Sequence, residues 1–554
     1  MTHQIDYEKL RGGYYTPKKI ADFLSRWAIR SENAQILEPS CGDGVFLESA
    51  VEALIDLGCN RGHLSDRILG IEIDPKEAHK AQERLSALRI SSTSKMIHNG
   101  DFFAYCRSTL FDKRSFDVII GNPPFIRYQN FPDEYREIAI DLMRKIGLDP
   151  NRYTNTWVPF LVISTSLLKE SGRLGMVVPA ELFQVDYAAE TRKFLSEIYG
   201  KLTIITFGKL VFGGIQQEVV LLLGVKGKNG TGKISIIELE DIQGMVVDKQ
   251  STRIESLSST VNEFEPIANS LEKWTQYFLN SEEISLLRAL RRDEQVSLTG
   301  ELFEVDIGVV TGRNKFFVLN NDQVEEYSLR PYTERIVTRS AHLRGAIFTK
   351  EDWMDNVRSE YGSYLFMPSD LPFQDLPQEV REYIVRGEEN DIHKGYKCRI
   401  RNRWYIVPSV WIPDAFMLRQ VHDFPKLVLN ETEATCTDTI HRVRLLKREN
   451  GKKVAAAFLN SLTFAFSEIT GRSYGGGVLT FEPSEAERLP LPIIGADSLD
   501  LNKIDKLLRL NKIYEILEIN DEILLSEELG LDRKEISMLR KIWQKLRDRR
   551  INRK

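Results

Sequence analysis

A short apolar strand that runs into two consecutive prolines constrains this chain more than any other feature. Residues 116–120 (Phe-Asp-Val-Ile-Ile) have the apolar, β-branched pattern of a buried strand, and Gly121 closes it. Asn122 precedes a proline, which favours an extended backbone, while Pro123 and Pro124 fix their own φ and lack amide donors. The sequence therefore predicts a stiff elbow at the carboxyl end of a strand, where α/β sheets bind ligands.

The elbow offers groups that suit the exocyclic amino group of a nucleic acid base. The side-chain oxygen of Asn122 and the carbonyl oxygen of Pro123 can both accept from an NH2 group, and Phe125 can stack on the ring that carries it. Because turns are rich in asparagine and proline, an ordinary strand-to-loop turn is the alternative. The strand before the elbow and the aromatic residue after it favour the functional interpretation.

Three earlier strand ends carry ligand-type residues as well. Residues 35–58 read as a strand, a glycine loop and a helix, and a glycine loop lets the backbone approach a ligand closely. Residues 68–73 predict a second strand that ends at the acid Glu72, and a third unit ends at Asp101. Because strand ends of a doubly wound sheet share one edge, we expect all four to form one site.

The order of these motifs resembles that of the gamma-class amino-methyltransferases, the TaqI-type DNA adenine methyltransferases. The resemblance covers about residues 11–225, and it is specific because the order of the motifs itself defines the class. The matching segments are Tyr15-Thr16-Pro17, 37–44 (Leu-Glu-Pro-Ser-Cys-Gly-Asp-Gly), 70–75 (Gly-Ile-Glu-Ile-Asp-Pro), 100–102 (Gly-Asp-Phe), 122–125, 157–160 (Trp-Val-Pro-Phe), 172–179 and 211–214 (Val-Phe-Gly-Gly). This resemblance implies a Rossmann-like α/β methyltransferase domain with a mostly parallel, doubly wound sheet.

The resemblance implies roles for individual residues toward the cofactor S-adenosylmethionine. The implied cofactor-binding residues are Thr16, Glu38, Ser40, Gly42, Gly44, Glu72, Ile73, Asp101, Phe102, Pro124 and Phe160. Within this set, Glu38, Thr16 and Ser40 are implied to contact the methionine end of the cofactor. Glu72 holds the ribose, and Asp101 accepts from the cofactor's adenine amino group. No metal is expected.

The resemblance also implies a catalytic set and two aromatic residues that hold the target base. Asn122, Pro123 and Phe125 are the implied catalytic residues, and Phe125 and Phe212 are implied to stack on a flipped adenine. Many family members have tyrosine where this chain has Phe125. Phenylalanine can still stack on a base, but it cannot make the contact that a tyrosine hydroxyl would make. A core position is the alternative for Phe212, because phenylalanine prefers protein interiors. The adjoining glycines, Gly213 and Gly214, favour an exposed loop instead.

The implied reaction transfers a methyl group from S-adenosylmethionine to the exocyclic amino nitrogen of adenine in double-stranded DNA, at a specific sequence. The nitrogen is a poor nucleophile because its lone pair is conjugated, and the acceptors at Asn122 and Pro123 would localise that lone pair. A base inside a duplex cannot reach such a site, so it must flip out. We expect protection of DNA in a restriction–modification system, with a separate restriction endonuclease as a partner. Methylation of an RNA base or a protein glutamine, and a non-enzymatic DNA-binding module, are the alternatives.

The chain as a whole is typical of a soluble globular protein with two or three domains. It has 554 residues, of which 42% are hydrophobic and 28% charged, with a net charge of −5. Five scattered cysteines without metal-ligand spacing suggest a reducing compartment. No apolar run is long enough to cross a membrane, and the N-terminus lacks a signal-peptide pattern. We expect a cytoplasmic protein of a bacterium or archaeon, with no membrane partner.

We expect three parts: residues 1–245 for catalysis, 246–495 as an α+β DNA target recognition domain, and 496–554 as a helical, basic C-terminal segment. Basic and aromatic residues in the second part suit phosphate contacts and base readout, although each alone is also typical of a solvated loop. The DNA-binding candidates are Arg313, Arg401, Trp404, Arg472 and Tyr474. From Arg533 to Lys554 there are ten Lys or Arg and two acids, which favours a solvated helix face or a frayed tail over phosphate binding.

Overall fold

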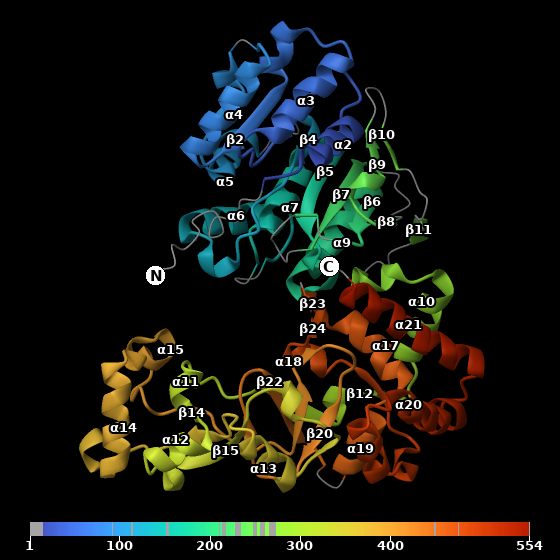
Figure 1. Ribbon diagram of the computed structural model, residues 1–554. Helices are drawn as coiled ribbons and strands as arrows, with labels where there is room; N and C mark the ends of the chain where they lie inside the picture. Colours follow the sequence, from blue (N-terminus) through green and yellow to red (C-terminus); the bar gives the residue numbers. More distant parts are fainter. Residues whose placement is uncertain are drawn as a thin grey trace. The chain divides into compact units, whose positions relative to one another are not determined.

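The structure, a computed structural model, describes most of the chain. The described ranges are 15–90, 92–111, 115–150, 154–209, 211–212, 218–227, 234–247, 252–254, 261–264, 273–447, 450–474 and 476–552. These residues form two compact units: unit 1 is built on Met1–Ser281, and unit 2 on Glu282–Ser473 with Gly477–Ile551 (Figure 1).

Unit 1 is built on a nine-stranded sheet with the strand order β11-β8-β6-β7-β5-β4-β1-β2-β3. Its strands are β1 (Ile36–Glu38), β2 (Ile68–Glu72), β3 (Ile97–Asn99), β4 (Phe116–Gly121), β5 (Leu168–Pro179), β6 (Tyr199–Phe207), β7 (Val219–Lys226), β8 (Ile234–Leu239) and β11 (Val261–Phe264). Strands β1 to β5 are joined by parallel pairs, while β7 runs antiparallel to its neighbours β5 and β6. This mostly parallel sheet confirms the predicted fold class.

Strand β4 shows why its sequence reads as an unbroken apolar run. Val118 and Ile120 pack into the same cluster as side chains of α2 (Lys18–Ala28) and α3 (Val45–Asp56). Ile119 is also fully buried, and successive side chains of a strand point to opposite faces. The strand is therefore covered on both faces, so apolar residues follow one another instead of alternating with polar ones.

Local sequence sets where the connecting helices of unit 1 begin. Asp74 caps α4 (Pro75–Ala87) by accepting from the Lys76 amide at 2.9 Å, with Pro75 as the first helical residue. Asp101 caps α5 (Phe102–Tyr105) by accepting from the Ala104 amide at 2.8 Å. The remaining helices are α6 (Asp133–Lys145), α7 (Trp157–Leu167), α8 (Glu181–Gln184) and α9 (Ala189–Ile198).

Unit 2 combines small sheets with short helices, as expected for an α+β domain. Its larger sheets have the orders β13-β22-β18-β20-β16 and β14-β17-β15-β21. The strands are β12 (Val296–Leu298), β13 (Phe303–Ile307), β14 (Val318–Leu319), β15 (Thr333–Val337), β16 (Ile347–Phe348), β17 (Tyr364–Phe366), β18 (Ala415–Leu418), β19 (Gln420–Val421), β20 (Leu427–Asn430), β21 (Thr435–Cys436), β22 (Ile440–Leu445), β23 (Arg472–Tyr474), β24 (Val478–Thr480) and β25 (Pro490–Pro492). The helices are α10 (Ser281–Arg291), α11 (Asn314–Phe317), α12 (Asn321–Glu326), α13 (Lys350–Arg358), α14 (Gln378–Glu389), α15 (Tyr396–Arg399), α16 (Gly451–Ala457), α17 (Ser461–Thr470), α18 (Pro483–Ala486), α19 (Leu501–Arg509), α20 (Ile513–Asp521) and α21 (Arg533–Ile551).

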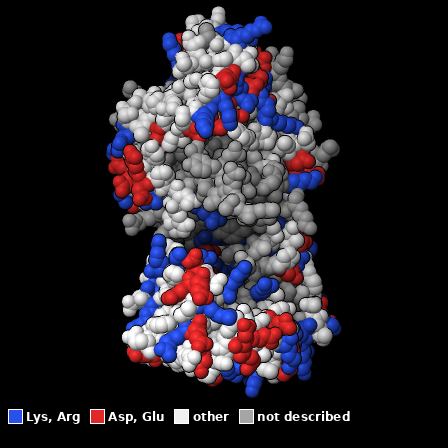
Figure 2. All heavy atoms as spheres, turned by 60° about the vertical axis from the view of Figure 1, so that its left-hand side comes forward, with Lys and Arg blue, Asp and Glu red and all other residues white. Residues whose placement is uncertain are grey.

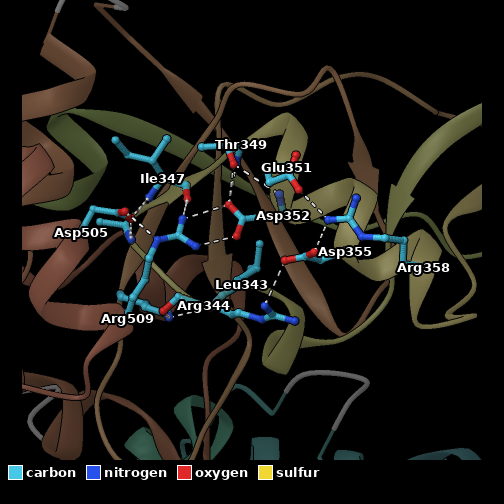
Figure 3. Close-up of polar contacts among 12 residues, drawn as sticks. Leu343, Arg344, Ile347, Thr349, Glu351, Asp352, Asp355, Arg358, Asp505 and Arg509 are labelled. Atoms are coloured by element: carbon cyan, nitrogen blue, oxygen red, sulfur yellow. Dashed lines mark hydrogen bonds and ion pairs between the residues drawn. The ribbon is translucent and has the colours of Figure 1, made fainter.

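The predicted C-terminal segment is helical, and charged hydrogen bonds join its helix α19 to the rest of unit 2. Arg509 of α19 donates to both carboxylate oxygens of Asp352 in α13, at 2.6 and 2.9 Å, and to Asp505 at 2.7 Å (Figure 3). Asp505 also accepts from the amides of Ala346 and Ile347, at 2.8 and 3.0 Å. These charge-assisted hydrogen bonds tie α19 to both α13 and the start of β16.

The basic helix α21 is an internal element of unit 2. Leu539, Ile542 and Trp543 on this helix are fully buried. Arg550 lies 2.6 Å from Glu468 of α17, and each side chain is 3% exposed. Further ion pairs to unit 2 are Lys534–Glu282, Arg540–Asp521, Lys545–Glu283 and Arg547–Asp423. The interpretation of this helix as a frayed tail is therefore wrong, whereas the basic residues Arg533, Lys534 and Lys541 do lie on a solvated face.

The predicted domain limits differ from the two compact units. Unit 1 continues to Ser281, because β11 pairs with β8 and so places Val261 opposite Ile237. A hairpin of β9 (Met245–Val247) and β10 (Thr252–Ile254) also lies past the predicted limit at residue 245. The segment 496–554 is part of unit 2 as far as Ile551. The division of catalysis and recognition between the parts of the chain stays a prediction.

The surface of unit 2 mixes charges of both signs. On the face that Figure 2 shows, Lys and Arg side chains alternate with Asp and Glu and do not merge into one basic field. On this face, contact with an anionic partner therefore depends on local groups of cations. Within the described ranges, no helix has the length and apolar character required to span a membrane.

Candidate active site

The carboxyl ends of β3, β2, β1 and β4 lie side by side at one edge of the unit 1 sheet. Ile36 of β1 pairs in parallel with Ile68 of β2 and with Val118 of β4, and Glu72 of β2 pairs with Asn99 of β3. The loops that follow these strands carry most of the predicted site residues. The prediction that the four strand ends share one edge is confirmed.

The glycine loop between β1 and α3 lies against the end of β2. The Gly42 amide donates to Glu72 Oε2 at 2.8 Å, and the Asp74 amide donates to Glu72 Oε1 at 2.8 Å. Gly44 has a φ of +84°, and a Cβ there would lie 2.9 Å from the Cβ of Ala81, so a larger residue does not fit. A carboxylate offers about four acceptor sites, so these two amides do not exhaust the capacity of Glu72.

Glu38, at the end of β1, is a buried carboxyl group. Its side chain is 1% exposed, and within the described residues its Oε2 has no hydrogen-bond partner. Burial, together with the nearby carboxylates of Asp43 and Glu72, raises the pKa of Glu38 well above its usual range. A buried polar atom without a partner is costly, so this edge is suited to a ligand with a cationic donor group.

The elbow contacts two of the predicted cofactor residues directly. Asn122 Nδ2 donates to Thr16 Oγ1 at 3.1 Å, and Ser40 Oγ donates to the carbonyl oxygen of Asn122 at 3.3 Å. Thr16 precedes α2, Ser40 follows β1 and Asn122 follows β4, so three distant segments of the chain meet here. The structure thus brings these three predicted residues together, with Pro123 and Pro124 next in the chain.

The side chains predicted to surround the cofactor's adenine differ in exposure. Ile73 is 53% exposed and offers an apolar surface to a ligand, whereas Phe102 and Phe160 are 2% and 7% exposed. The rings of Phe102 and Phe160 stack on each other with centroids 5.1 Å apart. Asp101 is half-buried, and burial raises its pKa. The roles of these residues toward a cofactor stay predictions.

The two aromatic residues predicted to hold the base also differ in exposure. Phe125 is partly buried and packs against the hydrophobic cluster, while Phe212 is 6% exposed and belongs to that cluster. Gly213 and Gly214 lie outside the described residues. As described, the Phe212 ring occupies a core position, and its stacking on a base stays a prediction.

Thr156 and Asn155 lie just before α7 and bond to residues in and just after the elbow. Neither was among the predicted site residues. Thr156 Oγ1 donates to the Pro124 carbonyl oxygen at 2.6 Å, and Asn155 Oδ1 accepts from the Tyr128 amide at 3.0 Å. The available signal was local: threonine and asparagine directly before an apolar helix are typical capping residues. The preference of threonine and asparagine for helix caps does not predict that these side chains bond to residues in and just after the elbow.

Two of the predicted DNA-binding residues in unit 2 support the protein's own structure. Arg401 Nη2 donates to the carbonyl oxygens of Val310 and Thr311, at 3.0 and 2.8 Å, and its guanidinium lies over the Phe317 ring. Trp404 Nε1 donates to Glu388 Oε1 at 3.1 Å. These contacts favour a structural role, and the proposed contact of either side chain with DNA stays a prediction.

A basic hollow of about 430 Å³ adjoins Arg401 in unit 2. Its lining residues are Val310, Asp370, Lys397, Ile400, Arg401, Asn402, Arg403, Ile406 and Pro408. Arg313 is exposed and follows Val310 of the lining by three residues in the chain. Arg403 pairs with Asp370, whereas no ion pair of Arg313 or Lys397 occurs within the described residues. The hollow is thus suited to an anionic ligand.

The remaining two candidates lie in β23. Arg472 Nε pairs with Glu485 Oε1 at 2.9 Å, and Glu485 is 1% exposed. The side chain of Tyr474 lies outside the described part of the chain. The structure therefore ties Arg472 to a buried acid, and both DNA contacts stay predictions.

Two family models match the chain. Residues 4–286, more than half of the 554 residues, match the model described as N-6 DNA Methylase. Residues 271–525 match the model described as Type II methyltransferase M.Eco57I, C-terminal domain. The first match contains all the predicted catalytic and cofactor residues, and the second lies largely in unit 2.

Similar proteins include Type II methyltransferases of bacteria. The chain is 22% identical to Type II methyltransferase M.AccI of Acinetobacter calcoaceticus, over 94% of this chain and 92% of that protein. It is 27% identical to Type II methyltransferase M.HindII of Haemophilus influenzae, over 65% of this chain and 63% of that protein, which is under two thirds of its length. The solved structure of the Type IIL restriction-modification enzyme MmeI in complex with DNA shares the fold, with a TM-score of 0.57, 11% identity, and coverage of 96% of this chain and 75% of that one.

Proposed function

The chain belongs to the N-6 DNA methylase family, as a DNA adenine methyltransferase of the restriction–modification type, and we propose that the strand ends of unit 1 form its active site. At this edge a methyl group would pass from S-adenosylmethionine to the exocyclic nitrogen of a flipped-out adenine. The observation that carries the proposal is the meeting of Asn122 with Thr16 and Ser40, beside the buried Glu38. Sequencing the DNA of a host that expresses the protein for N6-methyladenine at a single motif tests it directly.

The residues at the edge fit S-adenosylmethionine, which supplies the methyl group when bound. The Glu38 carboxylate, whose Oε2 has no partner in the described chain, would hold the ammonium group of the methionine moiety. Glu72 would accept from the ribose hydroxyls at the end of the second strand. The exposed side chain of Ile73 would pack on the adenine ring. Glu38 ends β1, and Glu72 and Ile73 lie at the end of the neighbouring strand β2, so all three belong to the same edge.

The elbow acts on the target amino group by orientation and electrostatics. Asn122 turns its Nδ2 toward Thr16, which presents Oδ1 as the atom that accepts from an amino group. The carbonyl oxygen of Pro123 is the second acceptor. Together they would draw both amino hydrogens out of the ring plane, which takes the nitrogen lone pair out of conjugation and directs it toward the methyl group. Stacking on Phe125 offsets part of the free energy of flipping, by about 1–3 kcal/mol.

Replacing Glu38 by glutamine is expected to lower the affinity for S-adenosylmethionine by about 10–100-fold, since hydrogen bonds to charged groups contribute about 1.5–3 kcal/mol. Burial raises the pKa of Glu38 in the free enzyme, whereas a bound ammonium group would favour the ionised carboxylate and lower that pKa. Binding should therefore release a proton and tighten as the pH rises toward that raised pKa. Titration calorimetry in two buffers of different ionisation enthalpy measures both effects.

The matched control is Glu32→Gln, an exposed glutamate before β1 at the opposite edge of the sheet. This variant should bind S-adenosylmethionine with unchanged affinity and release the same number of protons as the parent. If Glu38→Gln binds normally, or if proton release persists in that variant, Glu38 does not hold the ammonium group.

We propose that cations around the hollow of unit 2 contact DNA phosphates. Replacing the exposed Arg313 by alanine should weaken binding to specific and non-specific DNA alike and reduce the slope of log K against log salt by about 1. Arg358→Ala is the control, because Arg358 already pairs with Glu351 and Asp355. Fluorescence anisotropy at several salt concentrations gives both slopes. An unchanged slope for Arg313→Ala removes it from the interface, and a changed methylation motif assigns it to base readout.

A separate restriction endonuclease of the same system is the partner that we propose, because the similar Type II enzymes are named as methyltransferases alone. The recognition sequence is set by side chains that reach base edges, so the methylated motif in host DNA would also identify the cleavage site of that partner.

A further inference from the structure

The elbow lacks the hydrogen bonds that usually hold a chain at the end of a strand. The ladder between β4 and β5 ends where Gly121 pairs with Met176. Pro123 and Pro124 then contribute no amide donors. A rigid elbow must therefore be held through its carbonyl groups and through the amides that follow the prolines, those of Phe125 and Ile126.

The hydroxyl of Thr156 bonds to one group of each kind. Thr156 Oγ1 donates to the Pro124 carbonyl oxygen at 2.6 Å and accepts from the Ile126 amide at 3.0 Å. The Thr156 amide also donates to the Ile126 carbonyl oxygen at 3.1 Å. Thr156 is 1% exposed, so water does not compete with these bonds.

These hydrogen bonds restrain the two peptide groups on either side of Phe125. The Pro124 carbonyl belongs to the peptide before Phe125, and the Ile126 amide belongs to the peptide after it. The orientations of these two planes define φ and ψ of Phe125, so one hydroxyl restrains both torsions. These torsions set the direction in which the Cα–Cβ bond of Phe125 leaves the backbone and restrict its rotamers.

Asn155 extends the same support by one further peptide. Its Oδ1 accepts from the Tyr128 amide at 3.0 Å, and its Nδ2 donates to Tyr187 Oη at 2.9 Å and Glu181 Oε2 at 3.2 Å. Tyr187 Oη donates to the same Glu181 oxygen at 2.6 Å. The amide of Asn155 is thus held in one orientation by a network that is anchored in α8.

We propose that Thr156 is a positioning residue for methyl transfer, which sets the Phe125 ring against the target base and holds the elbow rigid. This inference rests on the proposed function of the elbow. Within the described chain, Thr156 bonds to the backbone of Pro124 and Phe160, and no hydrogen bond joins it to Asn122. Its effect is transmitted through the backbone on both sides of Phe125.

Replacing Thr156 by valine keeps the shape and removes the hydroxyl. Turnover is expected to fall by about 10–100-fold, because small misplacements of a reacting group have effects of that size. The affinity for S-adenosylmethionine should stay unchanged. With 2-aminopurine at the target position, the complex should fluoresce more brightly, because the flipped base stacks less well on Phe125. Thr156→Ser retains the hydroxyl and should recover turnover to within about 3-fold of the parent.

Thr165→Val is the matched control. Thr165 lies in α7, the helix that follows Thr156, is fully buried, and bonds to the Leu161 carbonyl oxygen and Tyr199 Oη, away from the elbow. Its variant should have the turnover and fluorescence of the parent. Normal turnover of Thr156→Val overturns the inference, as does a Thr156→Ser variant as slow as Thr156→Val, which would assign the effect to packing of the methyl group. If Asn122→Ala also turns over normally, the proposed elbow mechanism fails instead.

Discussion

Replacing Asn122 by alanine is expected to lower the turnover number by about 10²–10³-fold, which corresponds to about 2.7–4 kcal/mol of lost transition-state stabilisation. The variant loses one of the two acceptors for the target amino group and the hydrogen bond to Thr16 Oγ1. Binding of S-adenosylmethionine and DNA should change little, since Glu38, Glu72 and the cations of unit 2 are untouched. Single-turnover kinetics on a duplex with one methylation site measures the loss at the chemical step.

Asn33→Ala is the matched control for this experiment. Asn33 is exposed before β1, at the opposite edge of the sheet, where it accepts from Arg67. This variant should methylate DNA at the parent rate. Near-normal turnover of Asn122→Ala would exclude the elbow as the source of the amino-group contacts. A loss of both turnover and cofactor affinity would indicate that Asn122 supports the cofactor pocket through Thr16 and Ser40.

Replacing Arg550 by methionine is expected to destabilise unit 2 by about 3–5 kcal/mol, because it leaves the buried Glu468 carboxylate without its cation. The change also removes donors to the His422 and Gly477 carbonyl oxygens. Urea unfolding of the full chain, followed by tryptophan fluorescence, measures the loss. Trp543 of the same helix is fully buried, so its emission reports on undocking of α21.

Two variants separate the buried ion pair from other effects. Arg533→Met changes an exposed arginine in the first turn of the same helix and should alter stability by no more than about 0.5 kcal/mol. The double variant Arg550→Met with Glu468→Met should recover most of the loss, since apolar side chains of similar size replace both buried charges. If Arg550→Met is as stable as the parent, α21 does not depend on this pair. The basic run would then be open to the phosphate-binding role.

Much of unit 1 was predictable because its signals are local. The apolar run of β4 requires cover on both faces, Asp74 and Asp101 cap the helices that follow them, and the prolines stiffen the elbow. The order of the motifs placed four strand ends at one edge, and the strand pairing confirms that arrangement. Each of these conclusions depends on residues that are close together in sequence or on a general rule of sheet topology.

The errors have a common cause in long-range pairing. The interpretation of the basic run of α21 as a frayed tail missed its ion pairs, because charge patterns do not show which acids lie opposite them in space. Glu468 is separated from Arg550 by 82 positions, and Asp423 from Arg547 by 124. The limit predicted at residue 245 missed β11 for the same reason, since that strand is short and is recognised only through its pairing with β8.

The sequence by itself determined the backbone of the elbow, the strand that leads into it and the types of group that face the target base. These follow from steric limits on φ and from side-chain chemistry, which act within a few residues. Only the tertiary structure decided what holds that elbow in place and which buried carboxylate at its edge has an oxygen without a hydrogen-bond partner among the described residues. Thr156 reaches Pro124 across 32 positions, and Glu38 is buried by the packing of whole elements around it. Hydrogen-bond partners and desolvation are properties of the packed chain, so no local pattern contains them.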